Sequence, residues 1–286
     1  MLKQEVAEEL ALIKMDRFSR MKKIDIKDYV NDSHGNDEAQ TRTIVRNVLQ
    51  YSCTMEHVRE LSLEDSNLVS IGPGLLTGCV LKLHTLNLRY CQLDKDDLLA
   101  LVSNIHCSNN LKNINLSCMD LSCLPPHMLQ VTAEVLEELS LNNSSLSVDQ
   151  CKSIIIGVRN NPLMTSLGMG GQENLKHLPT EMMLDMITPK MKCLELNGTN
   201  LTPKQMEVIF QQISKLPVMS KLDLTRNILT EVDKDILAEA LSNVEELGRD
   251  GVVALLGQIF KKQNTKRVNL YEVNLLMLTN PYLVRL

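Results

Sequence analysis

The sequence predicts an α/β fold in which similar layers stack along one axis, and three observations support this. Leu, Ile, Val and Met supply nearly all of the 44% hydrophobic content, whereas aromatic residues make up only 3% and Trp is absent. A short aliphatic pattern recurs along the chain at intervals of 25 to 28 residues. Apolar residues recur at helical spacing between its copies. Because one such unit cannot bury its own leucines, the copies must stack around a shared core.

The aliphatic pattern is LxxLxLxx(N/C)xL, the signature of leucine-rich repeats. Its clear copies are VRELSLEDSNL from Val58, LHTLNLRYCQL from Leu83, LKNINLSCMDL from Leu111, LEELSLNNSSL from Leu136, MKCLELNGTNL from Met191, MSKLDLTRNIL from Met219 and TKRVNLYEVNL from Thr265. A weaker copy, MTSLGMGGQENL from Met164, carries an extra residue before its last Leu. The 46 residues between Met219 and Thr265 are too many for one repeat, and VEEL within them matches the opening of VREL and LEEL. We therefore expect a shortened repeat that begins at Val244.

Each copy is expected to contain a short strand. The fourth and sixth residues would point inward and the residues between them outward, which is the period of a strand. Strands of successive copies would form a parallel concave sheet, with helical or irregular convex segments between them. The predicted architecture is therefore a leucine-rich-repeat solenoid, or horseshoe, with one elongated core.

Helix signals lie between the predicted strands. N-cap residues are expected at four places, the first two as complete capping boxes: Ser147 with Gln150, Thr202 with Gln205, Asp94, and Thr230. Two series of apolar residues are interpreted as core faces of helices: Leu98, Leu101, Val102 and Ile105, then Met206, Ile209, Phe210 and Ile213. Proline soon after a strand would delay or shorten the helix at Pro73, Pro125 and Pro179. Longer helical repeats should therefore alternate with more irregular ones.

The chain is expected to have two parts. Residues 1–56 would form a helical N-terminal cap, with an amphipathic helix carried by Leu2, Val6, Leu10, Ile13, Met21 and Ile24. Residues 38–50 would be the helix of a partial first repeat, and residues 57–286 would hold the repeats and a C-terminal cap. Caps are needed because the end layers of a solenoid expose apolar faces. A separate helix that recruits a partner is the alternative for the N-terminal segment.

The repeats resemble the ribonuclease-inhibitor-like class of leucine-rich repeats over about residues 40–280. Within that class, CQLDKDDLLALVSNI and LGRDGVVALLGQI are similar to repeats at the C-terminal end of nucleotide-binding leucine-rich-repeat receptors of innate immunity. Those receptors also carry an ATPase module with a GxxxxGK[ST] loop, which this sequence lacks. The resemblance therefore implies only their sensing and autoinhibitory part.

The ninth motif position, usually Asn or Cys, departs from the pattern. It is filled by Ser66, Cys91, Met119, Ser144, Gln172, Thr199, Asn227 and Val273. Buried backbone groups normally paired by that side chain need other partners at Met119 and Val273. We therefore expect local irregularity at these two positions.

Composition and charge exclude several classes of partner. The net charge of -5 comes with mixed signs and no long basic stripe, so nucleic acid is not expected. No apolar run of 18 residues exists, and acidic residues interrupt the start of the chain, which predicts a cytoplasmic protein with neither a membrane span nor a signal peptide. The eight cysteines lie singly and are interpreted as small buried hydrophobes.

No enzymatic constellation is recognisable, and no cofactor, metal or small-molecule substrate is expected. The six histidines are scattered without metal-ligand or triad spacing. His106 and Cys107 are the single close pair of base and nucleophile, and neighbouring side chains are expected to point apart. GMGGQ at residues 168–172 lacks the setting of a phosphate-binding loop.

The outward strand residues are the candidate binding surface for a protein partner, whose identity the sequence does not reveal. Candidate partner-binding residues are Asn87, Arg89, Tyr90, Asn142, Glu195, Asn197, Asp223, Arg226 and Tyr271. The alternative for most of them is a merely solvated face. Gly168, Gly170 and Gly171 would either let a partner approach the backbone or mark a decayed repeat.

The predicted function is a non-enzymatic protein-protein interaction module, a scaffold or a ligand-sensing repeat domain. The alternative is a regulator of an enzyme in trans. A GTPase-activating protein would need a catalytic Arg on an edge loop, and a ubiquitin-ligase substrate receptor would need an N-terminal adaptor-binding motif. Neither signal is evident in residues 1–56.

Overall fold

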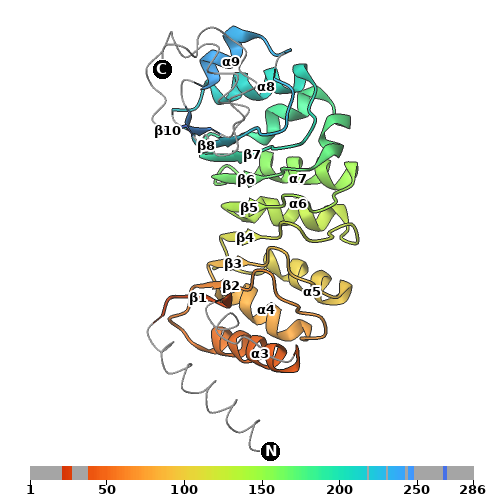
Figure 1. Cartoon of the computed structure of the whole chain (residues 1–286), viewed down its shortest axis with the longest axis vertical. Coiled ribbons are helices and arrows are strands. Elements are labelled where there is room, and N and C mark those ends of the chain that lie inside the picture. The colour runs from red at the N-terminus through yellow and green to blue at the C-terminus, as the bar shows by residue number, and fades with distance from the viewer. Residues whose placement is uncertain are drawn as a thin grey trace, which may run out of the picture. The chain divides into compact units, whose positions relative to one another are not determined.

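A computed structural model describes residues 21–27, 38–217, 219–229, 231–241, 244–247 and 267–268 of the chain. The chain divides into two compact units, Met1–Ser145 and Leu146–Leu286. Each unit repeats one plan, a short strand followed by a turn and a helical segment (Figure 1).

Unit 1 is built on a parallel sheet of five described strands in the order β1-β2-β3-β4-β5. The strands are β1 (Lys23–Asp25), β2 (Glu60–Ser62), β3 (Thr85–Asn87), β4 (Asn113–Asn115) and β5 (Glu138–Ser140). The helices are α3 (Glu38–Thr54), α4 (Pro73–Lys82), α5 (Lys95–Ile105) and α6 (Pro126–Val135). They lie along one side of the sheet (Figure 1).

Unit 2 continues the same plan with strands in the order β6-β7-β8-β9-β10. They are β6 (Ser166–Gly168), β7 (Cys193–Glu195), β8 (Met219–Asp223), β9 (Val244–Leu247) and β10 (Arg267–Val268). Its helical segments are α7 (Val148–Asn160), the 3-10 helices η2 (Glu173–His177) and η3 (Thr180–Met186), α8 (Pro203–Ile213) and α9 (Lys234–Leu241).

The leucine-rich-repeat fold predicted from the motif is confirmed. In unit 1 the fourth motif residues stand side by side, from Leu61 through Leu86 and Ile114 to Leu139. The strand of the shortened repeat expected at Val244 is also confirmed, because β9 pairs in parallel with β8 on one side and with β10 on the other, whereas residues 248–266 of that repeat lie outside the described residues.

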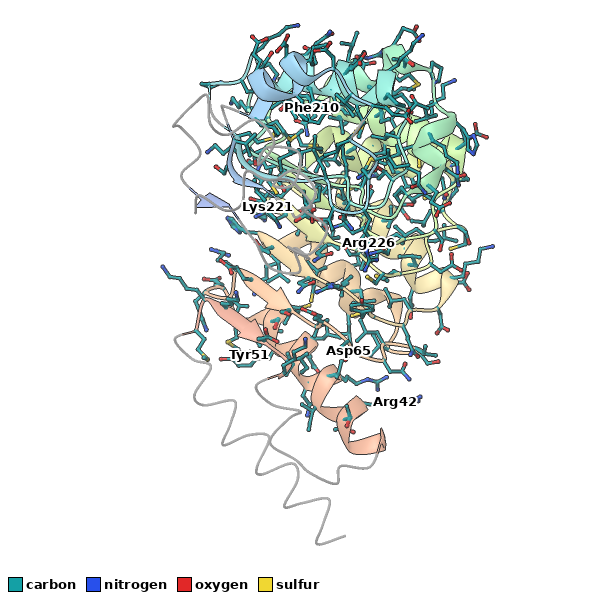
Figure 2. The ribbon with its side chains drawn as sticks, turned by 45° about the horizontal axis from the view of Figure 1, so that its top comes forward. Arg42, Tyr51, Asp65, Phe210, Lys221 and Arg226 are labelled. Atoms are coloured by element: carbon teal, nitrogen blue, oxygen red, sulfur yellow. The ribbon has the colours of Figure 1, made fainter. Side chains whose placement is uncertain are left out.

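The core lies between the strands and the helices of each unit. The fourth and sixth motif residues of the copies from Val58 to Met219 are almost fully buried, and so are the two predicted helix faces of α5 and α8. Phe210 of α8, labelled in Figure 2, is the largest fully buried side chain of the described residues. Aliphatic burial of this kind supplies most of the stabilisation of each layer.

The turn that follows each strand from β2 to β8 uses a left-handed residue at the eighth motif position. Asp65, Tyr90, Cys118, Asn143 and Arg226 have φ between 55° and 64°, and glycines 171 and 198 take the same place in other copies. This conformation is unfavourable for residues with a Cβ. Stacking stabilises it, because the N–H of Tyr90, for example, donates to the Ser117 carbonyl of the next repeat at 3.0 Å.

Two of the four predicted N-caps are confirmed. Both capping boxes, at Ser147 and Thr202, are present. Asp94 precedes α5 but makes no cap hydrogen bond, because its carboxylate accepts from the backbone N–H of Ser70 instead. Thr230 lies outside the described residues, and the carboxylate of Asp233 accepts the N–H groups of Asp235 and Ile236 in the first turn of α9.

The prolines delay helices, yet within the described residues only one of the three proline-containing repeats is irregular. In α4 and α6 a proline stands at the start of a regular ten-residue helix. Pro179 precedes the 3-10 helix η3, which follows η2. The predicted alternation of long and irregular repeats is therefore wrong, and of the three repeats expected to be irregular only the one that begins at Met164 is so.

The N-terminal segment contains a strand that the helical pattern did not predict. Ile24, expected on the face of an amphipathic helix, lies in β1 opposite Leu61 and is 1% exposed. The carbonyl of Lys22 accepts from the N–H groups of Arg59 and Glu60, which adds β1 to the sheet as an additional layer. Residues 1–20 and 28–37 lie outside the described residues. The helix expected over residues 38–50 is α3, which extends to Thr54.

Candidate protein-binding face

The outward side of each sheet is formed by the third, fifth and seventh motif residues, which we call the outward strand face. In unit 1 its centre is polar and half-buried to exposed, apart from Ser62 and Ser117, which are buried. Its members between β2 and β5 are Glu60, Ser62, Glu64, Thr85, Asn87, Arg89, Asn113, Asn115, Ser117, Glu138, Ser140 and Asn142.

Asn and Asp at the fifth position have a structural role at the end of the strand. The side-chain oxygens of Asp25, Asn87, Asn115 and Asp223 each accept the backbone N–H two residues later, at 2.9 to 3.1 Å. That N–H follows the last ladder bond of the strand and needs an acceptor. Two predicted binding residues, Asn87 and Asp223, therefore use one oxygen to hold their own backbone.

The predicted residues Asn87, Arg89 and Tyr90 form one cluster with Glu64, which we call the Arg89–Tyr90 cluster. The Arg89 guanidinium lies 3.5 Å from the Glu64 carboxylate and 4.9 Å from the centre of the Tyr90 ring. The amide nitrogen of Asn87 donates to the other oxygen of Glu64 at 3.3 Å. Glu64 also pairs with Lys27 of the preceding layer at 3.2 Å.

Arg89 and Tyr90 are the exposed members of this cluster, and Glu64 and Asn87 are half-buried. Tyr90 is 49% exposed and has a left-handed φ of 58°. Burial alone lowers the pKa of Arg89, but Cys118 and the charge of Glu64 outweigh that effect and leave the pKa raised. Arg89 is therefore a permanent cation held between a carboxylate and an aromatic ring.

Asn142 belongs to a separate, uncharged group on β5. Its side-chain nitrogen donates to the Ser140 hydroxyl at 3.2 Å, and that hydroxyl lies 2.8 Å from the hydroxyl of Ser117. The Ser117 hydroxyl in turn accepts the backbone N–H of Asn142. These side chains satisfy one another and form a polar, neutral continuation of the face.

In unit 2 the outward strand face contains an ion pair that includes the predicted residue Glu195 and lies next to the predicted residue Asp223. Glu195 of β7 bonds to Lys221 of β8, and Asp223 lies two residues after Lys221. Burial lowers the pKa of Lys221, but the hydrogen bond and charge of Glu195, with Cys193 and Asp223, leave it raised overall. Glu195 and Lys221 therefore largely neutralise each other.

Gly170 does not leave the backbone open to a partner, as one interpretation of the glycines predicted. Gly168 and Gly170 are both buried, and a Cβ at Gly170 would overlap the side-chain oxygen of Asn197 in the next repeat. Asn197 thus fills the space that the missing side chain leaves. The glycine permits close packing between layers rather than access for a ligand.

Two predicted residues remain, Arg226 and Tyr271. Arg226, labelled in Figure 2, is exposed at the left-handed turn after β8, and its neighbour Ile228 is 65% exposed. Tyr271 and Val273 lie outside the described residues.

Two charged residues of the face, Glu64 and Lys221, were not among the candidates. Each faces an opposite charge in the next or preceding copy, Arg89 and Glu195 respectively. Aligning the copies by motif position would have placed Glu64 beside Arg89, whereas Lys221 aligns with Cys193 and reaches Glu195 diagonally.

His106 and Cys107 lie closer together than expected. The thiol of Cys107 is 3.3 Å from the Nε2 atom of His106, so the expectation that the two side chains point apart is wrong. Both are exposed just beyond the end of α5, away from the strand face. No acidic side chain of the described residues hydrogen-bonds to His106, so the imidazole lacks the orienting partner of a catalytic triad.

The part of the chain that the structure describes holds no group of three or more His, Cys, Asp or Glu residues placed to bind a metal ion. None of its helices combines the length and the apolar character needed to span a membrane.

No protein-family model matches the chain, and comparison with curated proteins gives no match. Among similar solved structures is the crystal structure of the leucine-rich repeat-containing protein LegL7 from Legionella pneumophila. That match covers 87% of this chain and 82% of the other, with 15% sequence identity and a TM-score of 0.49. The repeat architecture of this chain accordingly rests on its own motif and strand register.

Proposed function

We propose that this chain is a non-enzymatic protein-binding module, a scaffold or ligand-sensing repeat domain that holds a protein partner on its outward strand face. The observation that supports this most is the Arg89–Tyr90 cluster, with Arg89 held 4.9 Å from the centre of an aromatic ring that is 49% exposed. Arg and Tyr are the residue types enriched where binding energy concentrates. Side chains already fixed before binding also lose less entropy on association.

The cluster favours a particular chemistry in the partner. The Tyr90 ring offers exposed apolar area, and the guanidinium has donors beyond those that face Glu64. A partner segment with an apolar side chain next to a carboxylate or carbonyl oxygen would satisfy both. Asn142, Ser117 and Ser140 would supply neutral polar contacts around it.

We also propose that the chain has a cytoplasmic sensing or scaffolding role. The resemblance of its repeats to the ribonuclease-inhibitor-like class, and to the repeats of innate-immunity receptors, supports this role. Further contacts in unit 2 would come from Arg226, Glu195, Asn197 and Asp223. We also propose that residues 1–56 form a separate N-terminal cap.

The test is a double variant that removes the cluster and keeps the fold. Arg89→Ala with Tyr90→Asn removes both contact groups, and Asn tolerates the left-handed backbone at position 90. Proteins retained by the wild-type chain on an affinity column would be identified, and direct binding of a purified one measured by calorimetry. We expect the double variant to weaken binding by about tenfold or more.

Arg159→Ala is the matched control. Arg159 pairs with Asp185 at 3.4 Å and is 55% exposed, much like Arg89, but it lies on the helix α7. The Arg159→Ala variant should bind the partner as tightly as the wild-type chain does. Unchanged affinity in the folded double variant would refute the proposed surface. If the partner is a GTPase or a ligase subunit, turnover and pull-down assays would identify regulation of an enzyme in trans.

A further inference from the structure

Two cysteine thiols meet between α3 and α4, on the helical side of unit 1. Cys53 lies near the end of α3 and Cys79 in α4, and their Sγ atoms are 2.9 Å apart. Cys79 is buried, whereas Cys53 is half-buried. Solvent therefore reaches one sulfur of the pair much more readily than the other.

The packing of the two helices holds the sulfurs together. The Cys53 thiol lies 3.2 Å from the carbonyl oxygen of Leu75, and that of Cys79 lies 3.9 Å from the carbonyl oxygen of Leu49. Gly78 leaves room for this contact, since a Cβ there would lie 3.2 Å from the Cys53 sulfur. The sequence interpretation of all eight cysteines as isolated small hydrophobes therefore does not describe this pair.

The surroundings make the two thiols chemically unequal. The hydrogen bond from Cys79 lowers the pKa of Cys53 against the opposing effect of burial, and the positive charge of Lys82 lowers it further. The Lys82 ammonium is fixed nearby, because it donates to the Cys53 carbonyl oxygen at 3.0 Å. The same thiol contact, together with burial, raises the pKa of Cys79 well above its ordinary value. The accessible sulfur thus favours the thiolate, and the buried one keeps its proton.

We propose that Cys53 and Cys79 form a redox-reactive thiol pair that low-molecular-weight disulfides, such as glutathione disulfide, oxidise to an intramolecular disulfide. In the first step the Cys53 thiolate attacks one sulfur of glutathione disulfide, a mixed disulfide forms on Cys53, and one glutathione thiolate leaves. That thiolate takes up the Cys79 proton. The Cys79 sulfur then attacks the Cys53 sulfur and releases the second glutathione as a thiolate, which takes up the proton that Cys53 had given to solvent. Two cysteine thiols are oxidised and one glutathione disulfide is reduced.

The product would connect α3 covalently to the first complete repeat. A disulfide bond is about 2.0 Å long, so the two sulfurs need only a small approach of their helices. The bond would restrict the unfolded chain between residues 53 and 79. We expect it to raise the midpoint of thermal unfolding by about 5 °C.

The experiment treats the full chain with glutathione disulfide at neutral pH, then quenches with acid, alkylates free thiols and maps peptides by mass spectrometry. The expected product is a linked pair of peptides carrying Cys53 and Cys79. The variant Cys79→Ser should stop at the mixed disulfide on Cys53, and Cys53→Ser should leave Cys79 reduced. Removing the exposed thiol by Cys107→Ser should leave the rate of linkage unchanged.

Lys82→Met keeps both thiols and so tests the pair without removing it. Its reaction should be several-fold slower at neutral pH, with a smaller difference above pH 9, where Cys53 ionises without help. The proposal is overturned if the wild-type chain accumulates a stable mixed disulfide on Cys53 while Cys79 remains open to alkylation after acid quenching and denaturation. Linkage of Cys53 to any other cysteine would overturn it as well.

Discussion

The ninth residue of each repeat shows how different side chains meet one backbone requirement. The carbonyl oxygen of the sixth residue lies past the last ladder bond of the strand. It accepts from the Cys91 thiol at Leu63, from the Ser144 hydroxyl at Leu116, and from the Asn227 amide at Leu196. At Leu88, where the donor of the next repeat would be Met119, the carbonyl accepts the backbone N–H of Cys91 instead.

Met119 therefore does not disturb the sheet, contrary to the irregularity expected from its apolar side chain. The register runs unbroken from β3 through β4 to β5. The expectation treated the side chain as the only donor available to the carbonyl, whereas the left-handed turn brings a backbone N–H within reach. Sequence patterns at this position report side-chain donors and miss backbone ones.

Gly170 and Asn197 provide a residue-scale prediction of coupling between neighbouring repeats. Gly170→Ala should destabilise the fold by about 1–3 kcal/mol, because its Cβ would overlap the Asn197 side chain. In the double variant with Asn197→Ala the overlap disappears, so the two effects should not add. Urea denaturation of the four chains measures this coupling. Additive free energies would show that the overlap is relieved in another way.

At the scale of elements, the sequence predicts the strands and helices that follow from the repeat motif. It misses the features that depend on contacts between one particular segment and its neighbours. The strands, the core faces of α5 and α8, and both capping boxes follow from local spacing. Strand β1 does not, because KID carries no repeat motif and is extended only by pairing with Glu60, Leu61 and Ser62. Asp94 has a cap-forming side chain, but Ser70 of the preceding repeat competes for its carboxylate.

The candidate site was predictable to a similar degree. Residue type and motif position select Arg89 and Tyr90, and the structure brings them together with Glu64. Spacing could not reveal that Asn87 and Asp223 accept their own backbone N–H groups. Nor could it reveal that Asn197 fills the space above Gly170, because that requires the side-chain conformation.

The capping box of α8 carries a prediction at this scale. The Thr202 hydroxyl accepts the N–H of Gln205 at 3.3 Å, and the Gln205 side chain accepts the N–H of Thr202 at 2.9 Å. Thr202→Ala should cost about 1 kcal/mol and speed hydrogen exchange in the first turn of α8. Gln211→Ala on the exposed end of the same helix is the control, with little expected change. Equal effects of the two variants would show that the cap adds no local stability.

At the scale of the whole molecule, the order of the repeats along the chain is also their order in space within each unit. In unit 1 the described strands pair in sequence order, β1 with β2, β2 with β3, β3 with β4 and β4 with β5. The outward strand face is therefore assembled by contacts between successive repeats. Stability in such an arrangement is close to a sum over repeats and their interfaces.

This arrangement predicts that damage to one repeat spreads unevenly. Leu61 of β2 and Leu139 of β5 are each 1% exposed, and truncation of either to Ala should cost about 2–5 kcal/mol. With nearest-neighbour coupling, Leu61→Ala should accelerate amide hydrogen exchange most around β2 and least around β5, and Leu139→Ala should give the reverse gradient. Mass spectrometry of the exchanging full chain resolves the two profiles, with the exposed substitution Glu138→Ala as a control. If both leucine variants gave the same uniform acceleration across unit 1, the repeats would be unfolding as a single cooperative block, and the additive description of this fold would have to be abandoned.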